Sequence, residues 1–343
     1  MSDAPRPTPP ATNSRIAMRA RPSGAIGLDH FQRYDEPLRD LQPDEVLVEN
    51  VLLSVAPAAR ASMQMDTYRP QLVAGETIPS TVIGRVLRAP ADGPAVGSLV
   101  AGFAGWEQYS IMHAAQLRPL TAVAPVEQYL SVLGQNGLTA YFGLTRIGRV
   151  QAGETVLVSG AAGGVGHLAG QIARVLGARV VGVTSSADKN AALVDELGFS
   201  AAVDRRSDTF PEDLARALPD GVDVYFDNVA GPVTDTVLPL MNRHGRIVCC
   251  GATSFYETGA RPTTGIAGIS LTAVVKSLRV EGFLVGDFRS QWSEATEVLR
   301  DWRRSEQIRS IEKISDGLDS APAALLALLD GQNLGQAGVR LRP

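Results

Sequence analysis

The chain has 343 residues, of which 45% are hydrophobic and 20% charged, and its formal net charge is −4. This length suits one large or two medium domains, and an acidic balance without a basic block argues against a nucleic-acid or membrane-surface partner. Residues 1–14 are rich in proline and lack the apolar core of a secretory signal, so we expect a flexible lead-in there.

The first third of the chain reads as short strands separated by glycine and proline. Residues 44–57 alternate in polarity and then become apolar throughout, as a strand that passes from half-buried to buried would. Residues 80–90 and 97–112 continue the pattern. A β-rich first domain is therefore expected.

After a helical pattern at 126–148, strands and helices alternate. Because strands that are buried on both faces and joined by helices form parallel sheets, this part predicts a doubly wound Rossmann domain. The last segment, 323–343, ends in a strand that comes too late for that sheet, and we expect it to return to the first domain. The strands of the alternating part are expected at 155–160, 178–184, 201–204, 221–229, 245–251 and 277–285.

A glycine-rich turn follows the first strand of the alternating part. It holds Gly160, Gly163, Gly164 and Gly166, and a helix starts near Val165. Glycine lets the backbone approach a pyrophosphate, and the helix N-terminus presents N–H groups to it. The position of the turn, after the first strand of such a domain, predicts a dinucleotide site that includes Gly163, Gly164 and Val165.

The next strand ends without the acid that often holds the adenosine ribose. Thr184, Ser185 and Ser186 stand at this place, and Lys189 follows. A carboxylate would bind a ribose hydroxyl and repel a 2′-phosphate, whereas hydroxyls beside an ammonium favour the phosphate. The pattern therefore favours NADP(H) over NAD(H), with Thr184, Ser185 and Lys189 as contacts.

Three further charges bear on this choice of cofactor. Arg205 and Arg206 follow the third strand, whose end neighbours the same site in a doubly wound sheet. They support a phosphate site, although the alternative is that they are ordinary solvated charges. Asp188 lies in the same loop with the wrong sign, and a phosphate site requires it to point away.

The sequence offers little for metal or nucleophilic chemistry. A zinc dehydrogenase needs a set of thiolates or imidazoles around an open position. The two cysteines, Cys249 and Cys250, are neighbours on a predicted strand, where they point to opposite faces, and the four histidines are scattered. We predict no metal site, no disulfide framework and a reducing, cytoplasmic compartment.

Tyr256 follows the strand that ends at Gly251, at the edge of the sheet where ligands of α/β proteins bind. A phenol there can donate a hydrogen bond to a carbonyl oxygen that gains charge as a hydride arrives. The alternative is a tyrosine that packs under the loop with its hydroxyl in water.

Eight segments in combination carry a family resemblance: "VLLSVAP" with Arg60, "GLTAYFGL", "GETVLVSGAAGGVG", "GQIARVLGARVVGV", "GVDVYFDNVAG", "GRIVCCGATSFY", "LRVEGFLV" and "GQNLGQAGV". Nearly the whole chain after residue 15 resembles the zinc-independent branch of the medium-chain dehydrogenase/reductases. Within that branch it is similar to the prostaglandin/leukotriene reductase-like and alkenal double-bond reductases.

The resemblance implies a GroES-like substrate domain, 15–128 and 299–343, and a Rossmann NADP-binding domain, 129–298. It implies that NADPH delivers hydride to the β-carbon of an α,β-unsaturated ketone or aldehyde, while Tyr256 stabilises the enolate oxygen. It also implies a homodimer, for which the edge strand 278–285 could pair. The cofactor contacts it adds or supports are Lys189, Arg205 (where relatives have tyrosine), Asn228, Val229, Gly251, Ala252, Tyr256, Phe283, Leu284, Val285 and Asn333.

One segment departs from the family pattern. Relatives carry Asp-Pro-Tyr-Met-Arg where this chain has "VAPAAR", so Ala56 and Ala58 replace an acid and an aromatic, and a differently shaped pocket is expected. Two alternatives therefore stay open. One is a quinone reductase, or a biosynthetic reductase of a conjugated or iminium intermediate, on the same fold. The other is a non-catalytic NADPH-binding protein.

Overall fold

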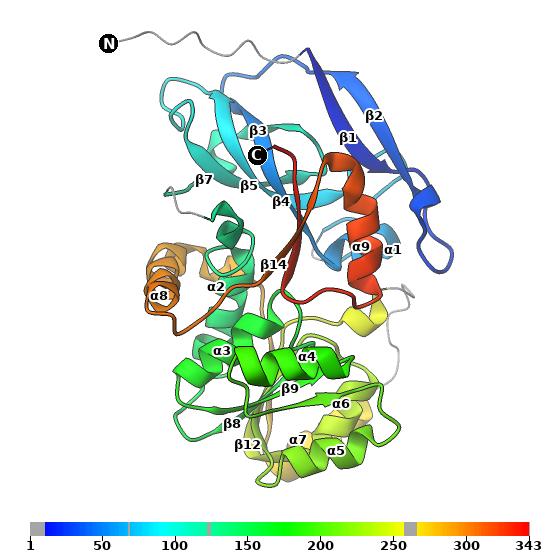
Figure 1. The fold of residues 1–343 in the computed structure, drawn as a ribbon, viewed down its shortest axis with the longest axis vertical. Helices are drawn as coiled ribbons and strands as arrows, with labels where there is room; N and C mark the ends of the chain where they lie inside the picture. The colour runs from blue at the N-terminus through cyan, green and yellow to red at the C-terminus, as the bar shows by residue number, and fades with distance from the viewer. Residues whose placement is uncertain (1–10, 68, 122–124, 257–265, 343) are drawn as a thin grey trace. The chain divides into compact units, whose positions relative to one another are not determined.

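The computed structural model describes residues 11–67, 69–121, 125–256 and 266–342, the side chains of 266–268 excepted (Figure 1). The chain divides into two compact units. Unit 1 comprises Met1–Leu130, Ile314–Asp330 and Ala337–Pro343, and unit 2 comprises Ser131–Lys313 and Gly331–Gln336.

Unit 1 is built on an antiparallel sheet. The register between β3 and β4 shifts between Asn50 and Leu52, so the residues of β3 that join the core change from Val46 and Val48 to Leu53 and Val55. This bulge explains why the β3 sequence first alternates and then runs apolar. In the described residues the sheet order is β14 (Glu312–Asp316), β15 (Gln336–Arg340), β3 (Glu45–Val55), β4 (Pro79–Arg88), β5 (Leu99–Gly105) and β7 (Arg118–Pro119), and β6 (Tyr109–His113) also pairs with β3.

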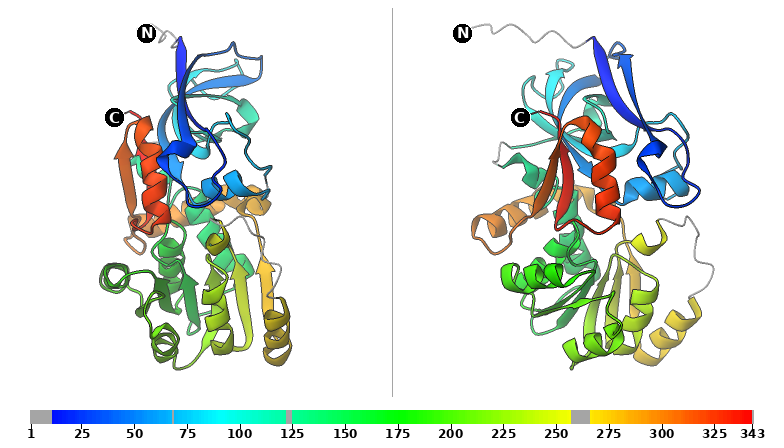
Figure 2. Two further views of the ribbon diagram at one scale, coloured as in Figure 1. Left: turned by 90° about the vertical axis from the view of Figure 1, so that its right-hand side faces the viewer. Right: turned by 45° about the vertical axis from the view of Figure 1, so that its right-hand side comes forward.

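The two ends of the described chain join unit 1 as strands. β15 pairs antiparallel with β3, so the last strand of the chain lies in the sheet of unit 1. Helix α9 (Ala321–Leu329) lies beside β14 and β15 and buries Leu325 in the unit 1 core (Figure 2). Unit 1 also contains helix α1 (Ala58–Gln64).

We expected residues 1–14 to form a flexible lead-in, and this expectation is wrong for residues 12–14. Strand β1 (Thr12–Met18) already pairs there with β2 (Phe31–Pro37). Asn13 Nδ2 donates to the carbonyl oxygen of Tyr109 at 2.8 Å, and the amide of Tyr109 donates back to Asn13 Oδ1 at 2.9 Å. These paired bonds hold the segment against the sheet. Residues 1–10 lie outside the described residues.

Unit 2 is a doubly wound parallel sheet. Numbered by position in the chain, its strands are ordered 3-2-1-4-5-6, the Rossmann order, so the switch point lies between β8 and β11. In the part of the chain that is described, the order is β10 (Ala201–Asp204), β9 (Arg179–Thr184), β8 (Thr155–Ser159), β11 (Val222–Asp227), β12 (Met241–Cys249) and β13 (Arg279–Gly282).

Helices cover both faces of this sheet. Figure 1 shows α3 (Gly166–Val175) and α4 (Ala187–Ala191) along one side of the strands and a second group of helices along the other. No described helix has both the length and the apolar character that a membrane crossing requires. The second group consists of α5 (Phe210–Ala217), α6 (Pro232–Val237) and α7 (Ile266–Lys276), and unit 2 also contains α2 (Gln135–Phe142) and α8 (Trp292–Arg304).

The division into units differs from the expected boundaries in one respect. Residue 299 was expected to begin the return to the first domain, but it lies inside α8. Leu299 is fully buried, so the helix has to stay with the core that it packs against. The return comes only after Lys313, and the short segment Gly331–Gln336 comes back to unit 2.

Candidate functional site

The turn after β8 has the tight geometry that the sequence predicted. Gly160 has a φ of +57°. A Cβ atom on Gly166 would lie 2.2 Å from the carbonyl oxygen of Gly160, closer than any real contact, so only glycine fits where α3 meets the turn. The turn thus brings the N-terminus of α3 directly behind β8, which is the arrangement that binds a pyrophosphate.

A segment from near the C-terminus is tied to this turn. Gly163 forms an isolated parallel bridge with Gly335, and the amide of Gly335 donates to the carbonyl oxygen of Ala162 at 2.9 Å. Asn333 is buried, and its Nδ2 donates to the carbonyl oxygen of Gly335 at 3.0 Å. The predicted contact Asn333 therefore lies next to the glycine turn and shapes the segment that packs on it.

Two polar side chains crowd the backbone at Gly164. A Cβ atom there would lie 2.5 Å from Gln336 Oε1 and 2.7 Å from Asn136 Nδ2. Asn136 also donates a hydrogen bond to Gln336. Gln336 was not among the predicted site residues, although its place in the late "GQNLGQAGV" segment could have suggested it.

His167 links the glycine turn to a second distant segment. Its Nε2 accepts from the amide of Ile311 at 3.3 Å, so Nδ1 carries the proton and donates to the carbonyl oxygen of Gly163 at 2.8 Å. Full burial lowers the pKa of His167 to about 4. One turn later, Gln171 donates to the carbonyl oxygen of Arg309 and accepts its amide. The helix thus holds residues 309–311 in place.

The end of β11 carries a buried carboxylate, Asp227, that accepts five hydrogen bonds. Its side chain is 4% exposed, and the sequence analysis gave it no role. The buried carboxylate of Asp227 is tolerated because each of these five groups donates a hydrogen bond to it. Oδ1 accepts from Ser159 Oγ (2.8 Å), Tyr225 Oη (2.8 Å) and the amides of Val229 and Ala230 (2.9 Å each), and Oδ2 accepts from Thr234 Oγ1 (2.6 Å).

This carboxylate organises the loop at the switch point. Asn228 donates from its amide to Ser159 Oγ and from Nδ2 to the carbonyl oxygen of Ser159, which fixes it against the end of β8. The amide of Gly251 donates to the carbonyl oxygen of Asp227, and Ser254 binds the carbonyl oxygen of Val229 through both its amide and its hydroxyl. The predicted contacts Asn228, Val229 and Gly251 are therefore brought together.

Tyr256 lies in the loop after β12, half-buried. The amide of Ala252 donates to the phenol oxygen of Tyr256 at 3.4 Å, and the amide of Tyr256 donates to the carbonyl oxygen of Thr253 at 3.3 Å. The phenol thus faces the backbone at Ala252, another predicted contact. The neighbouring residues 257–265 lie outside the described residues.

At the ends of β9 and β10 the structure gathers positive charge. Burial is the first cause that lowers the pKa of Lys189, and the cations Arg206, Arg205 and Lys313 add to it. Lys189 Nζ donates to the carbonyl oxygen of Gly331 at 2.6 Å. None of the four cations forms an ion pair with another described residue. Lys313 was not predicted, because it comes from the start of β14.

The serines and acids of this loop take different positions. Thr184 is buried, and its hydroxyl donates to Asn190 Oδ1 at 2.6 Å, so it stabilises the loop from inside. Ser185 Oγ lies toward the backbone of Gly331. Asp188 is exposed on the first turn of α4. The charged groups that shift the pKa of Lys189 are all cations, and Asp188 is not among them.

The predicted residues after β13 divide between packing and exposure. Phe283 packs toward Phe288, with ring centroids 6.3 Å apart, while the side chain of Leu284 is 48% exposed. The carbonyl oxygen of Val285 accepts from Trp292 Nε1 at 3.0 Å. Because Gly282 is in register with Cys249 on β12, these residues follow the strand next to the one that leads to Tyr256.

The thiols are poorly suited to metal or nucleophilic chemistry. Burial and the charge of Asp227 raise the pKa of Cys250 to about 12, so the thiol stays protonated, whereas metal binding and nucleophilic attack need the thiolate. In the described part of the chain, no group of three or more His, Cys, Asp or Glu side chains could hold a metal ion.

The residues present fit a phosphorylated dinucleotide. The glycine turn can take the pyrophosphate, and the cations near Lys189 lie beyond the ends of the two adjacent strands. A pocket of about 160 Å³ opens beside them, lined by Arg205, Val229, Ser254 and apolar side chains of α5 and α6. It places Arg205 and Val229, predicted from separate motifs, around one space.

Two family models match the chain. The model described as the N-terminal domain of oxidoreductase matches residues 14–120, and the model described as zinc-binding dehydrogenase matches residues 164–301. Together they cover parts of both units.

Whole-chain relatives narrow this assignment. The NADPH-dependent curcumin reductase of Escherichia coli is 34% identical over 96% of this chain and 97% of its own length. The NADP(+)-dependent 2-alkenal reductase of Nicotiana tabacum is 35% identical over 85% of this chain and 86% of its own length. The chain belongs to the zinc-independent alkenal/enone reductase branch of the medium-chain dehydrogenase/reductases.

A solved structure from this family has the same fold. CurA from Vibrio vulnificus in complex with NADPH aligns with a TM-score of 0.91 and 29% identity over 96% of this chain and 99% of that chain. The family resemblance seen in the sequence is confirmed, and so is its GroES-like plus Rossmann architecture.

Proposed function

We propose that the chain is an NADPH-dependent reductase that saturates the carbon–carbon double bond of an α,β-unsaturated ketone or aldehyde. The observation that carries this proposal is the cluster of unpaired cations around Lys189, next to a glycine turn at a Rossmann switch point. Relatives named as NADPH-dependent curcumin reductase and 2-alkenal reductase support it.

In this proposal, different residues of unit 2 bind different parts of the cofactor. The turn at Gly163 and Gly164 binds the pyrophosphate through backbone amides, and Lys189 and Arg205 bind the 2′-phosphate. The pocket at Arg205 and Val229 takes the adenine ring. Phe283 and Ala252 flank the nicotinamide at the end of the sheet.

Tyr256 acts on the substrate rather than on the cofactor. When bound, the reduced nicotinamide would supply a hydride to the β-carbon. The electron pair of the carbon–carbon π bond would then form a double bond between the α-carbon and the carbonyl carbon, and the carbonyl π pair would move to the oxygen. The Tyr256 phenol donates a hydrogen bond to that oxygen as it becomes an enolate. A proton from solvent then reaches the α-carbon, which completes the saturated product.

A panel of acceptors tests the reaction. Enals, enones, a conjugated diketone such as curcumin, and quinones are each offered to the full-length chain with NADPH or NADH, and cofactor oxidation is followed by absorbance. We expect turnover of enals or enones with NADPH and slower turnover with NADH. Oxidation by quinones alone would transfer the proposal to a quinone reductase, and tight NADPH binding without any turnover would indicate a binding protein.

Tyr256→Phe tests the role of the phenol. Loss of one hydrogen bond made in the transition state lowers kcat by roughly tenfold or more. Because the ring remains, the KM for NADPH should stay within about twofold of the wild-type value. Unchanged kcat would return Tyr256 to a packing role.

We also propose a homodimer formed through the edge of the Rossmann sheet. Among the described strands, β13 is the last of that sheet, and the adjacent α7 exposes Leu271, Val274 and Val275. An unpaired strand edge beside exposed apolar side chains favours association with a second copy. Light scattering should give twice 36.3 kDa for the wild type and a lower mass for Val274→Lys. A wild-type mass of 36.3 kDa would rule the dimer out.

A further inference from the structure

Two lysines from distant parts of the chain are held by adjacent carbonyl groups. Lys189, on α4, donates from Nζ to the carbonyl oxygen of Gly331 at 2.6 Å. Lys313, at the start of β14, donates from Nζ to the carbonyl oxygen of Gln332 at 3.0 Å. An ammonium group has three donors, so each lysine keeps donors for another acceptor after it binds the backbone.

The backbone at Gly331 is a point on which donors converge. A Cβ atom placed there would lie 3.3 Å from Ser185 Oγ, 3.7 Å from Lys189 Nζ and 3.8 Å from an Arg206 Nη atom. Ser185 and Lys189 come from the end of β9 and from α4, Arg206 follows β10, and Gly331 comes from a third segment with a φ of +73°. A hydroxyl, an ammonium and a guanidinium thus surround one small volume.

The charges of this cluster are not balanced within the described protein. Lys189, Arg206 and Lys313 lie near one another, and none forms an ion pair with a described side chain. Four acids adjoin these cations or Gly331 in the sequence. Asp204 accepts the backbone amide of Arg206 with Oδ1, and Glu312 accepts from the hydroxyls of Ser131 and Ser310. Asp188 and Asp330 are exposed. Like charges brought together without a counter-charge repel one another, and a bound anion relieves that repulsion.

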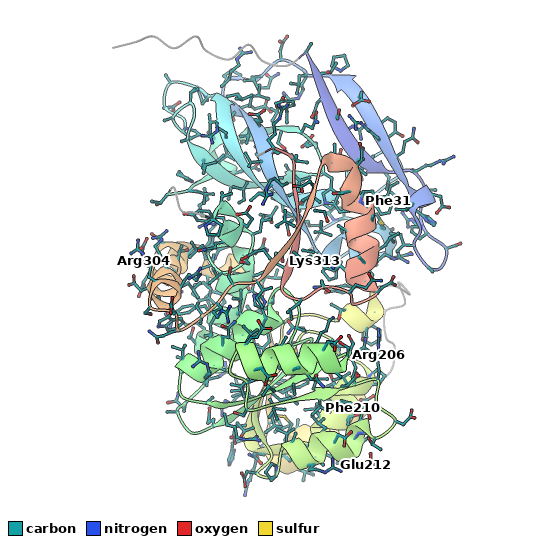
Figure 3. The ribbon with its side chains drawn as sticks, in the orientation of Figure 1. Phe31, Arg206, Phe210, Glu212, Arg304 and Lys313 are labelled. Atoms are coloured by element: carbon teal, nitrogen blue, oxygen red, sulfur yellow. The ribbon has the colours of Figure 1, made fainter. Side chains whose placement is uncertain are left out.

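Figure 3 labels two members of this cluster, Arg206 and Lys313, which lie 107 residues apart in the sequence. Lys313 is the last residue before the chain leaves unit 2, and Gly331 is the first residue after it returns. The carbonyl groups of Gly331 and Gln332 therefore reach the cluster only because the late segment returns to unit 2, where Gly331 accepts from Lys189 of α4.

We propose that Lys313 and the strap Gly331–Gln332 complete a preformed cage for a phosphate monoester, and that Lys313 is a specificity determinant for 2′-phosphorylated cofactors. The strap holds both ammonium groups in place before the ligand arrives, so little side-chain freedom is lost on binding. A dianionic phosphate satisfies the remaining donors, whereas the ribose hydroxyl of NADH leaves them with water. This inference rests on the proposed NADPH dependence and extends it to a residue outside the glycine and lysine motifs.

Binding of cofactor fragments tests the cage without any turnover. Calorimetric titrations of the full-length chain compare adenosine 2′,5′-bisphosphate with adenosine 5′-monophosphate, which differ only in the 2′-phosphate. Lys313→Gln should weaken binding of the bisphosphate by about tenfold, as expected for one charged hydrogen bond, and leave the monophosphate unchanged. Lys313→Arg keeps the charge and should restore most of the affinity.

Arg304→Gln is the matched control, because Arg304 is an exposed cation of unit 2 on α8, away from the cluster (Figure 3). It should bind both fragments as the wild type does. Equal affinities of the wild type and Lys313→Gln for the bisphosphate would overturn the inference. So would an equal loss for both fragments, which would mean that Lys313 only stabilises the fold.

The two proposals fail in distinguishable ways. A chain that selects the bisphosphate through Lys313 but reduces no enone would remove the proposed reaction and leave the cage intact. A chain that reduces enones equally well with NADPH and NADH, with Lys313→Gln indistinguishable from the wild type, would remove the cage and leave the reaction intact.

Discussion

At the ends of β8 and β11 one carboxylate is enclosed by five donors, whereas at the ends of β9 and β10 four cations meet without an ion pair among the described residues. Both sites lie at the carboxyl edge of the same parallel sheet. Asp227 is 4% exposed and its bonds are complete, so it serves the fold. The cluster around Lys189 and Lys313 has no counter-charge among the described residues, and we propose that a ligand supplies it.

The difference shows how to separate a structural charge from a binding charge. A buried ionised group without partners is too costly to keep, and the partners of Asp227 come from β8, β11, the loop after β11 and α6. A partly solvated cluster of like charges is tolerated in the free protein because water screens it. Substitutions at the two sites should therefore have opposite signatures in stability and in binding.

The largest effect is expected at Asp227. Asp227→Ala leaves several buried donors without an acceptor, each costing about 1–3 kcal/mol, so we expect the free energy of unfolding to fall by about 4 kcal/mol or more. Asp227→Asn is the matched variant. Its amide oxygen can replace Oδ1, and the Thr234 hydroxyl can turn to accept from the new amide, so the loss should be smaller.

Urea unfolding followed by circular dichroism measures both variants. A loss below about 1 kcal/mol in Asp227→Ala would mean that the five hydrogen bonds contribute little to stability and that the comparison between the two sites is wrong.

The next effect is a pH dependence that involves His167. Its pKa is about 4 in the folded protein and 6.5 as the unperturbed value. Because the folded-state pKa is depressed, the unfolded chain takes up the proton first. Stability is thus complete above pH 6.5 and falls between pH 6.5 and about 4, by about 3 kcal/mol for a shift of this size.

His167→Gln isolates this contribution. It removes the titrating group but keeps a side chain that can bind the backbone, so its melting temperature should fall less steeply over the same pH range. His244→Asn, which changes an exposed histidine at a φ of +63° that asparagine tolerates, is the control for a substitution away from the core. Equal slopes for the wild type and His167→Gln would assign the acid sensitivity to other groups.

The smallest effect on stability is expected at Lys189. In the absence of ligand, Lys189→Gln removes one of several mutually repelling cations and can still bind the carbonyl oxygen of Gly331. We therefore expect a change in melting temperature corresponding to less than about 0.5 kcal/mol, of either sign.

The same variant should lose most of the thermal stabilisation that adenosine 2′,5′-bisphosphate gives the wild type. A large destabilisation of the ligand-free Lys189→Gln chain would show instead that the cations are part of the structural framework, like Asp227.

Much of the unit 2 framework followed from local patterns. The apolar strands and the helices between them predicted a parallel sheet, and the glycines after the first strand predicted a tight turn at its end. Gly166 shows why such a motif is informative. No side chain fits beside the carbonyl oxygen of Gly160, so a glycine at position 166 already indicates that the backbone approaches closely there.

Local patterns described the late part of the chain less well. Residue 299 was expected at a domain boundary, but Leu299 is buried in the middle of α8. The sequence shows an amphipathic helix there, and which core that helix packs against is settled by contacts with residues far away in the chain. The same reason explains why Asp227 gave no signal, since its donor Ser159 is recognisable only once β8 and β11 are paired.

The sequence by itself determined the family, the order of strands and helices, and the missing acid at Thr184–Ser186 that favours a phosphate. Only the tertiary structure decided what surrounds that opening. Lys313 and Gly331 lie more than 100 residues beyond Lys189, and Gly331 reaches it because the chain leaves unit 2 after Lys313 and returns. Periodicity and motifs report neighbours along one strand or helix, whereas a binding cage is assembled from segments that meet only after folding.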